Sequence, residues 1–180
     1  AGALAGITGH RHQAWWQVLG IERPTALFSA THSNECMPAL NAPTEAQDVV
    51  GDYRSIGLTL GRHPIALLRE PLRQRGYRPA SELKQKGNRR IARAAGLVIN
   101  RQRPGAAKGV MFLTLEDETG IVNVVVWRNL AERHQDLLYN TQLLGVIGIW
   151  ERRGKVEHLI AGRFKNEAPL LGTLMNETTC

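Results

Sequence analysis

The sequence predicts an α+β protein in which a mainly helical segment precedes a small closed β-barrel of five strands. From Gly87 onward, apolar residues alternate with a period of two in segments of strand length, separated by turns that contain glycine. Before Gly87, apolar residues follow a helical period, and prolines interrupt them often enough to exclude long helices. The change of period divides the chain into a helical part and a barrel.

The first helix is predicted around Trp15, Val18 and Leu19, whose spacing of three and four residues places them on one helix face. Gly20 is suited to the C-terminus of this helix. We expect its apolar face to pack at a domain edge. The alternative is a direct DNA contact by the basic residues at its start, which are His10, Arg11 and His12.

Two further helices are predicted before the barrel. Thr44 and Gln47 have the spacing of a capping box, which predicts a helix that starts directly after Thr44. A second helix is predicted from Pro64, in its first turn, to a stop at Gly76, with a kink at Pro71. This connector carries no pattern of catalytic residues.

Three strands are predicted next. Ile91–Asn100 is the first, with Gly96 allowing the bend that small barrels need at a corner. Val110–Glu116 alternates between apolar and mixed faces, and Ile121–Trp127 returns after a turn that ends at Gly120. The alternation places Phe112 and Trp127 on the outer face of these strands.

One helix and two more strands complete the pattern. Asn129–Leu138 has helical spacing, and Gln142–Trp150 and Val156–Phe164 are strands joined by the turn Glu151–Lys155. Three strands, a helix and two strands is the order of the OB-fold, in which the helix lies between strands three and four. The predicted fold is therefore a five-stranded OB-fold β-barrel preceded by a mainly helical connector.

Composition limits the function. The 180 residues can bury one compact domain with a helical extension, and a formal net charge of +7 favours polyanionic partners. Cys36 and Cys180 lack the spacing of a disulfide framework or a zinc site. No apolar run could span a membrane and no secretory signal is visible, so we expect a cytoplasmic protein without membrane contact. Because it starts at Ala1, we expect a piece of a longer polypeptide.

OB-folds bind ligands across strands two and three, between the loop joining strands one and two and the loop joining strands four and five. Both loops are basic here: Arg101–Lys108 has three cations and no acid, and Glu151–Lys155 has three cations and one acid. A solvated charged surface is the alternative. Phe112 and Trp127 could stack on unpaired bases, or pack inside. The expected nucleic-acid-binding residues are Arg89, Arg90, Arg101, Arg103, Lys108, Phe112, Asn123, Trp127, Arg128, Arg152, Arg153 and Lys155.

No catalytic site is expected. Glu116, Asp117 and Glu118 could suggest metal-dependent phosphoryl transfer, but adjacent residues at a hairpin turn point in different directions, so we expect a solvated turn. His63 is expected to cap a helix and His134 to pack. The sequence contains no glycine-rich phosphate loop.

Three stretches carry a family resemblance: Gly9–Trp16, Ile56–Pro64 and Gly109–Gly120. In this order they resemble the C-terminal region of bacterial C-family DNA polymerases, in particular the error-prone relatives of the DNA polymerase III alpha subunit. The similarity extends to about Thr173. It implies four parts, which are the end of a helix-hairpin-helix region at 1–24, a connector at 25–87, an OB-fold domain at 88–165 and a C-terminal tail at 166–180.

The resemblance implies a non-catalytic module that binds single-stranded DNA within an error-prone polymerase acting in DNA replication, translesion synthesis and DNA repair. The nucleotidyltransferase site and its Mg²⁺ would belong to another region of the parent, so this chain needs no cofactor of its own. Accessory proteins of the mutagenesis complex are further implied partners. The alternative is a protein-interaction module that docks such accessory or replisome proteins. We find no sliding-clamp motif of the Gln-x-x-Leu-Phe type, so clamp contact is not expected.

Overall fold

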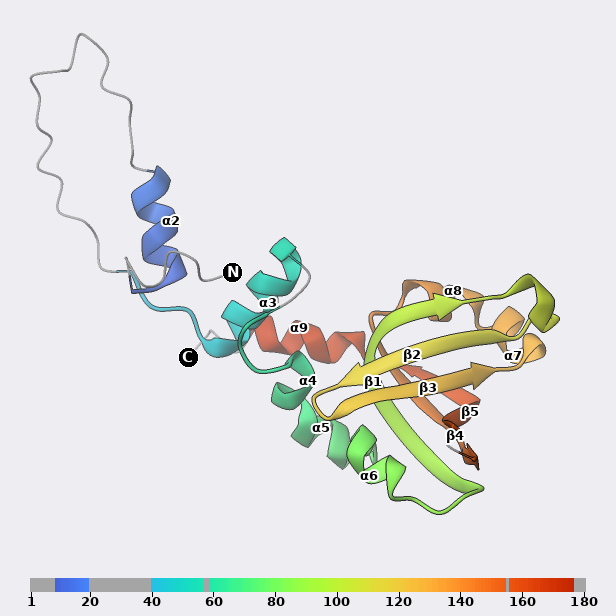
Figure 1. The fold of residues 1–180 in the computed structure, drawn as a ribbon. Coiled ribbons are helices and arrows are strands. Elements are labelled where there is room, and N and C mark those ends of the chain that lie inside the picture. Colours follow the sequence, from blue (N-terminus) through green and yellow to red (C-terminus); the bar gives the residue numbers. More distant parts are fainter. Residues whose placement is uncertain (1–8, 20–39, 57–58, 155, 177–180) are drawn as a thin grey trace, which may run out of the picture. The chain divides into compact units, whose positions relative to one another are not determined.

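A computed structural model describes residues 9–19, 40–56, 59–154 and 156–176 (Figure 1). The chain divides into two compact units, residues 1–61 and residues 62–180. The first unit contains the helices α2 (Arg11–Leu19) and α3 (Glu45–Ile56). Both helices were predicted, and both are confirmed. Gly20, the predicted stop of the first helix, lies outside the described residues.

The start of α3 is the predicted capping box. The hydroxyl of Thr44 accepts a hydrogen bond from the backbone N–H of Gln47 at 3.3 Å, and the side-chain oxygen of Gln47 accepts one from the N–H of Thr44 at 2.9 Å. Arg11, at the start of α2, forms an ion pair with Asp48 of α3 at 2.7 Å and a second with Asp52. These ion pairs join the two helices of the first unit.

The second unit contains the connector helices, the barrel and a C-terminal helix. The connector precedes the barrel, and two short helices lie between its third and fourth strands (Figure 1). The elements in chain order are α4 (Pro64–Leu67), α5 (Arg69–Gln74), α6 (Ala80–Lys84), β1 (Arg90–Gln102), η1 (Gly105–Ala107), β2 (Met111–Asp117), β3 (Gly120–Val126), α7 (Arg128–Arg133), α8 (Gln135–Asn140), β4 (Leu143–Arg153), β5 (Val156–Asn166) and α9 (Ala168–Asn176).

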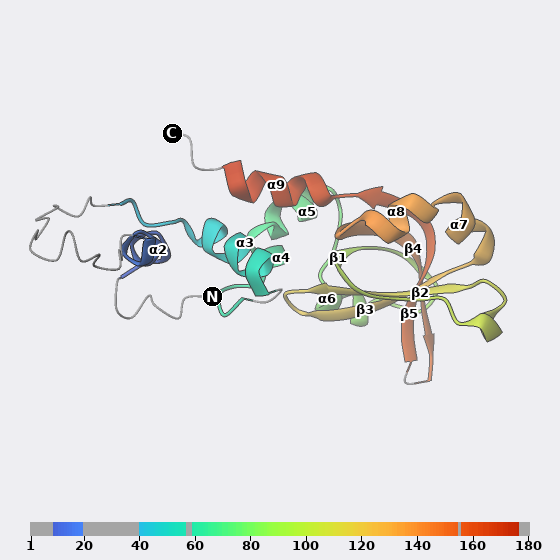
Figure 2. The same cartoon turned by 90° about the horizontal axis from the view of Figure 1, so that it is seen from above.

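The five strands close into a barrel in the order β1-β2-β3-β5-β4 (Figures 1 and 2). Four of the neighbouring pairs are antiparallel, and β3 and β5 are parallel. The predicted α+β class and five-stranded OB-fold are confirmed. The strand β1 serves two partners, because its first part, 90–97, pairs with β4 and its last part, 97–102, pairs with β2.

Gly96 lies where β1 changes partner. A Cβ atom there would stand 2.6 Å from the carbonyl oxygen of Glu116 in β2, closer than real side chains come. The absence of a side chain therefore allows the two backbones to approach at the corner of the barrel. The close approach to β2 gives a reason for glycine at position 96, and the predicted bend there stays a prediction.

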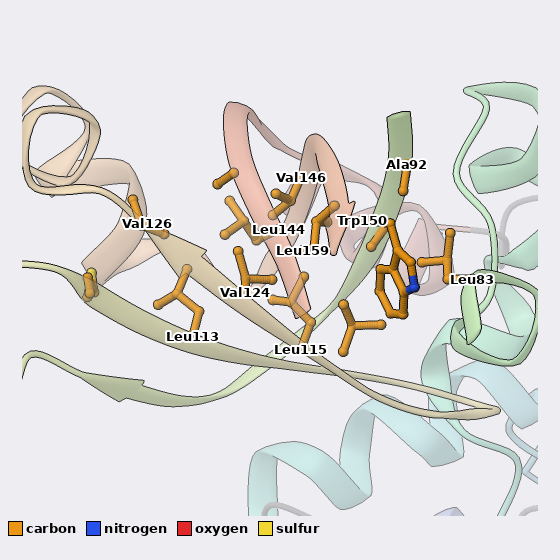
Figure 3. Close-up of a cluster of buried hydrophobic side chains, with 14 of the residues drawn as sticks. Leu83, Ala92, Leu113, Leu115, Val124, Val126, Leu144, Val146, Trp150 and Leu159 are labelled. Atoms are coloured by element: carbon orange, nitrogen blue, oxygen red, sulfur yellow. The ribbon is translucent and has the colours of Figure 1, made fainter. Parts of the chain in front are cut away.

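The interior of the barrel is filled by the apolar residues that alternate along each strand (Figure 3). Trp150 of β4 is 1% exposed and lies beside Leu83 of α6, so a connector helix contributes to the barrel core. Burying side chains of this size contributes roughly 1.5–3 kcal/mol each. The inward residues of β2 and β3 are Met111, Leu113, Leu115, Val122, Val124 and Val126.

The connector helix breaks at a different residue from the one expected. We predicted one helix with a kink at Pro71, but the chain forms α4 and α5, which meet at Leu68. Pro71 consequently lies in the first turn of α5, where a backbone N–H has no intrahelical acceptor and its loss costs little. His63 caps α4 as predicted, since its Nδ1 atom accepts from the N–H of Ile65 at 3.2 Å.

The helix predicted at Asn129–Leu138 is also divided, into α7 and α8, at His134. The His134 ring packs edge-on against Phe164 of β5, with a centroid distance of 5.6 Å. This contact confirms the packing role of His134. The prediction of one continuous helix was wrong, because contacts between distant residues shape the segment.

Candidate nucleic-acid interface

The outer face of β2 and β3 carries the side chains that alternate with the core. Phe112 lies opposite Val125, and Thr114 lies opposite Asn123. Phe112 is 40% exposed, and Asn123 is also exposed, so both predicted residues lie on the surface. Trp127 follows β3 directly, at the start of α7, and is 56% exposed. The face therefore presents aromatic rings to solvent, as the alternation predicted.

The loop between β1 and β2 is held against the start of α7. Lys108 and Gly109 both have positive φ angles, of 48° and 86°. The open side of Gly109 is covered by the aliphatic part of Arg128, because a Cβ at this glycine would meet the Cδ of Arg128 at 2.9 Å. Arg128 is thereby positioned beside the basic loop.

Arg103 and Arg128 share one carboxylate. The Nε of Arg128 donates to Glu132 at 2.9 Å, and Arg103 lies 3.6 Å from the same carboxylate oxygen. A guanidinium group has five N–H donors, so a single shared carboxylate leaves donors on both arginines for a phosphate. The side chains of Arg103 and Arg128 are 36% and 64% exposed. These two arginines and Lys108 form the basic group at this end of the barrel.

Arg101 has an intramolecular role. Its guanidinium donates to the carbonyl oxygens of Leu138 at 2.8 Å and Thr141 at 2.6 Å, which lie at the C-terminus of α8. These bonds satisfy carbonyl groups that a helix end leaves without partners. Arg101 therefore fixes α8 to β1, and a contact with nucleic acid stays a prediction for this residue.

The β4–β5 hairpin is attached to the connector by Arg152. Its guanidinium donates to Glu157 at 2.6 Å and to the carbonyl oxygen of Lys84 at 2.5 Å, and its backbone N–H donates to Asn88 at 2.9 Å. Arg153 differs, since its side chain is 77% exposed and lies 3.3 Å from Glu151. The two predicted arginines of this hairpin thus have separate roles. Lys155, also predicted, lies outside the described residues.

Arg89 and Arg90 lie beside the same hairpin. The N–H of Arg89 donates to the carbonyl oxygen of Trp150 at 2.8 Å, and Arg90 pairs with Trp150 in the β1–β4 register. Both arginine side chains are exposed. Figure 2 shows the β4–β5 hairpin and the β1–β2 loop as two separate projections from the barrel.

Glu151 reduces the positive charge of the hairpin. It accepts a hydrogen bond from Arg153 and lies 3.1 Å from Nε2 of His158. Desolvation acts to raise the pKa of Glu151, but the hydrogen bonds from His158 and Arg153 outweigh it and hold this pKa below the usual 4.5. Glu151 is therefore ionised at neutral pH.

The turn between β2 and β3 was predicted to be exposed to solvent, and that prediction was wrong. Asp117 is 6% exposed and accepts hydrogen bonds from the backbone N–H groups of Ala80 and Thr119, each at 2.7 Å. Arg69 of α5 donates to both carboxylate oxygens of Glu118, at 2.5 and 2.6 Å. The connector covers this turn, which is a tertiary contact that no local sequence pattern reveals.

Two pKa values reflect this burial. Desolvation acts to raise the pKa of Glu118, but the hydrogen bonds and the charge of Arg69 hold it below the usual 4.5. Burial lowers the pKa of His63 below 6.5, although the charges of Glu116, Glu118 and Asp117 act in the opposite direction. His63 is therefore neutral when the protein is folded at neutral pH.

Exposed aliphatic residues on the outer face were not among the predicted site residues. Ile91 is 70% exposed, Ile149 47% and Ile121 45%. The strand alternation indicated that they point outward, because Ile149 precedes the inward Trp150 and Ile91 precedes the inward Ala92. In the described ranges, none of the helices has both the length and the hydropathy needed to cross a membrane.

Known proteins similar to this chain include members of a domain family, full-length relatives and solved structures. Residues 92–165 match the family of OB-fold nucleic acid binding domains. The chain is 56% identical over 174 residues to the error-prone DNA polymerase of Alkalilimnicola ehrlichii, covering 97% of this chain and 17% of that protein. It is 51% identical over 171 residues to the error-prone DNA polymerase of Pseudomonas syringae pv. tomato, covering 95% of this chain and again 17% of the relative. A solved asparaginyl-tRNA synthetase from Pyrococcus horikoshii is 24% identical, with a TM-score of 0.41, over 48% of this chain and 21% of that one.

Proposed function

Since the chain is a relative of error-prone DNA polymerases and its barrel is an OB-fold of the nucleic-acid-binding family, we propose that the barrel binds single-stranded DNA as a non-catalytic part of such a polymerase. The parent would be a DNA-directed DNA polymerase whose nucleotidyl transfer takes place in another region. Its substrate would be the DNA strand that passes over the outer face of β2 and β3.

One observation carries the proposal: exposed aromatic rings lie on the outside of the barrel beside a group of exposed arginines. Phe112 and Trp127 are exposed on this face, with Arg103 and Arg128 near one end. Stacking of a base on an aromatic ring contributes about 1–3 kcal/mol and tolerates any base. Phosphate contacts add affinity without reading sequence. The expected binding is therefore salt-sensitive and weakly sequence-specific.

The geometry supports a single strand over a duplex. A base can stack on Phe112 only if its own face is exposed, and in duplex DNA both faces of each base are covered by neighbouring pairs. A duplex could still contact the arginines through its phosphates, but it would gain no stacking energy. Single strands should consequently bind more tightly than duplexes of the same length.

The neighbouring carboxylates support a non-catalytic role. Asp117 and Glu118 are engaged with Arg69, and Asp117 also accepts two backbone hydrogen bonds. Carboxylates that hold catalytic metal ions must instead converge on a common cation. The acidic turn therefore serves to hold the connector on the barrel.

Fluorescence anisotropy with a labelled oligothymidine at low salt tests the proposal. The double variant Arg103→Gln/Arg128→Gln should weaken binding about tenfold, because it removes two phosphate contacts. The connector supplies a matched control, Arg73→Gln/Arg78→Gln, since these arginines share Glu82 at 2.6 and 3.7 Å just as the first pair shares Glu132. We expect the control to bind normally.

Two outcomes would overturn the proposal. The first is the absence of binding by the unmodified protein at low salt. The second is an equal loss of affinity in both double variants, which would assign binding to the net charge alone. Retention of an accessory protein at high salt by all variants, without oligonucleotide binding, would favour a protein-interaction module instead.

A further inference from the structure

A row of outward apolar side chains continues the β2–β3 face around the barrel. The strand registers connect the members directly: each lies opposite the next on the neighbouring strand. The row therefore crosses all five strands without interruption. In spatial order its members are Ile91 of β1, Ile149 of β4, Ile160 of β5, Val125 of β3 and Phe112 of β2.

The side chains of this row face solvent. Ile91 is 70% exposed, Ile149 47% and Phe112 40%, while Val125 and Ile160 between them are partly buried. The neighbours that precede or follow them in sequence point into the barrel core. Single exposed apolar residues are common on protein surfaces and need no explanation. A continuous row of them is different and indicates a binding surface.

Cations border the row at both ends. Arg89 and Arg90 precede Ile91 and are exposed. Arg103 follows Gln102, which pairs with Phe112, and Arg128 begins α7 just after β3. Glu151, two residues after Ile149, is already paired with Arg153 and His158. This distribution is complementary to a polyanion that also carries apolar surface.

We propose that the bound single strand crosses the barrel along this row, from Phe112 over β3, β5 and β4 to Ile91, with its phosphates near the cations at either end. This path rests on the proposed function and extends it beyond the β2–β3 face. Neighbouring strands lie about 4.8 Å apart, so the row spans roughly 19 Å. That length corresponds to about six stacked nucleotides, or fewer if the bases are splayed.

The double variant Ile91→Gln/Ile149→Gln tests the path. Both side chains are outside the core, so the variant should fold normally, and circular dichroism and thermal unfolding would verify this. We expect at least fivefold weaker binding of an oligothymidine of about eight nucleotides, and a much smaller change for one of about three nucleotides. The matched control is Ile99→Gln, another exposed isoleucine of β1, 53% exposed, that lies outside the row. It should bind normally.

Photo-crosslinking provides a second readout that does not depend on affinity. A benzoylphenylalanine placed at position 91 should crosslink to the oligothymidine, and one placed at position 99 should not. Equal crosslinking at the two positions, or none at position 91 while the oligonucleotide is bound, would overturn the path.

The two proposals fail differently. If Arg103→Gln/Arg128→Gln weakens binding but Ile91→Gln/Ile149→Gln does not, the path along the row is wrong and the barrel still binds single strands on β2 and β3. If the unmodified protein binds no oligonucleotide, the proposed function itself is wrong. Loss of a protein partner by the isoleucine variant, with unchanged DNA binding, would assign the row to protein docking and overturn the path.

Discussion

The two ends of the β2–β3 hairpin use charge in opposite ways. At the turn, Asp117 and Glu118 are covered by the connector and bonded to Arg69. At the open end, Arg103 and Arg128 share one carboxylate and remain exposed. Both ends are rich in charged residues in the sequence, acidic at the turn and basic at the open end, and they differ in burial as well as in sign. Charged groups therefore stabilise the fold at the turn, whereas those at the open end are available to a ligand.

The largest expected effect is on stability at the turn. Asp117→Ala leaves the N–H groups of Ala80 and Thr119 without their acceptor and removes a partner of Arg69, which is 13% exposed. Breaking a buried, hydrogen-bonded charge cluster of this kind costs about 3 kcal/mol. Urea unfolding measures this loss.

The matched change at the open end should do little. Glu132→Gln removes the carboxylate that forms surface ion pairs with Arg103 and Arg128. Because surface ion pairs contribute little, this change should alter the free energy of unfolding by less than about 0.5 kcal/mol. If Asp117→Ala and Glu132→Gln lowered the free energy of unfolding by similar amounts, the two ends would not differ in their contribution to stability.

The next effect concerns affinity. Phe112→Ala should weaken binding of oligothymidine about tenfold, because one stacked base contributes about 1–3 kcal/mol. Phe112→Trp should retain binding, since stacking needs a flat ring of any type. Anisotropy titrations measure both. Normal affinity in Phe112→Ala would exclude stacking on this ring.

The smallest effect concerns pH. Burial lowers the pKa of His63 below 6.5, so the unfolded state binds a proton at a higher pH than the folded state does. The free energy of unfolding should therefore fall as the pH drops below about 6.5. His63→Asn keeps a side chain that can cap α4 and removes the titration, so this variant should lose less stability between about pH 7.5 and about pH 5.5. Equal losses of stability in the unmodified protein and in His63→Asn would show that His63 does not cause the pH dependence.

Local patterns predicted the barrel well. The period of two in β2 and β3 placed Phe112 outside and Leu113 inside, because alternation is a property of the strand itself. The capping box at Thr44 was predicted for the same reason, since it depends on a few adjacent residues.

Features that depend on distant contacts could not be predicted. Arg101 and Arg152 have the same sequence signature as Arg103 and Arg153, yet the first two bind backbone carbonyl groups of α8 and of Lys84. The helix α9 was also missed, although Leu170 and Leu174 are buried at 7% and 4% exposure. Each of these outcomes depends on residues far away in the sequence.

The salt dependence of oligothymidine binding shows directly whether the exposed arginines at the open end contact phosphates. Affinity would be measured from about 50 mM to about 200 mM salt for the unmodified protein and both double arginine variants. A single-strand phosphate contact adds about 0.7 to the slope of log affinity against log salt, so Arg103→Gln/Arg128→Gln should lower the slope by about 1.4. Arg73→Gln/Arg78→Gln should leave the slope unchanged. Equal slopes for all three proteins would contradict the account.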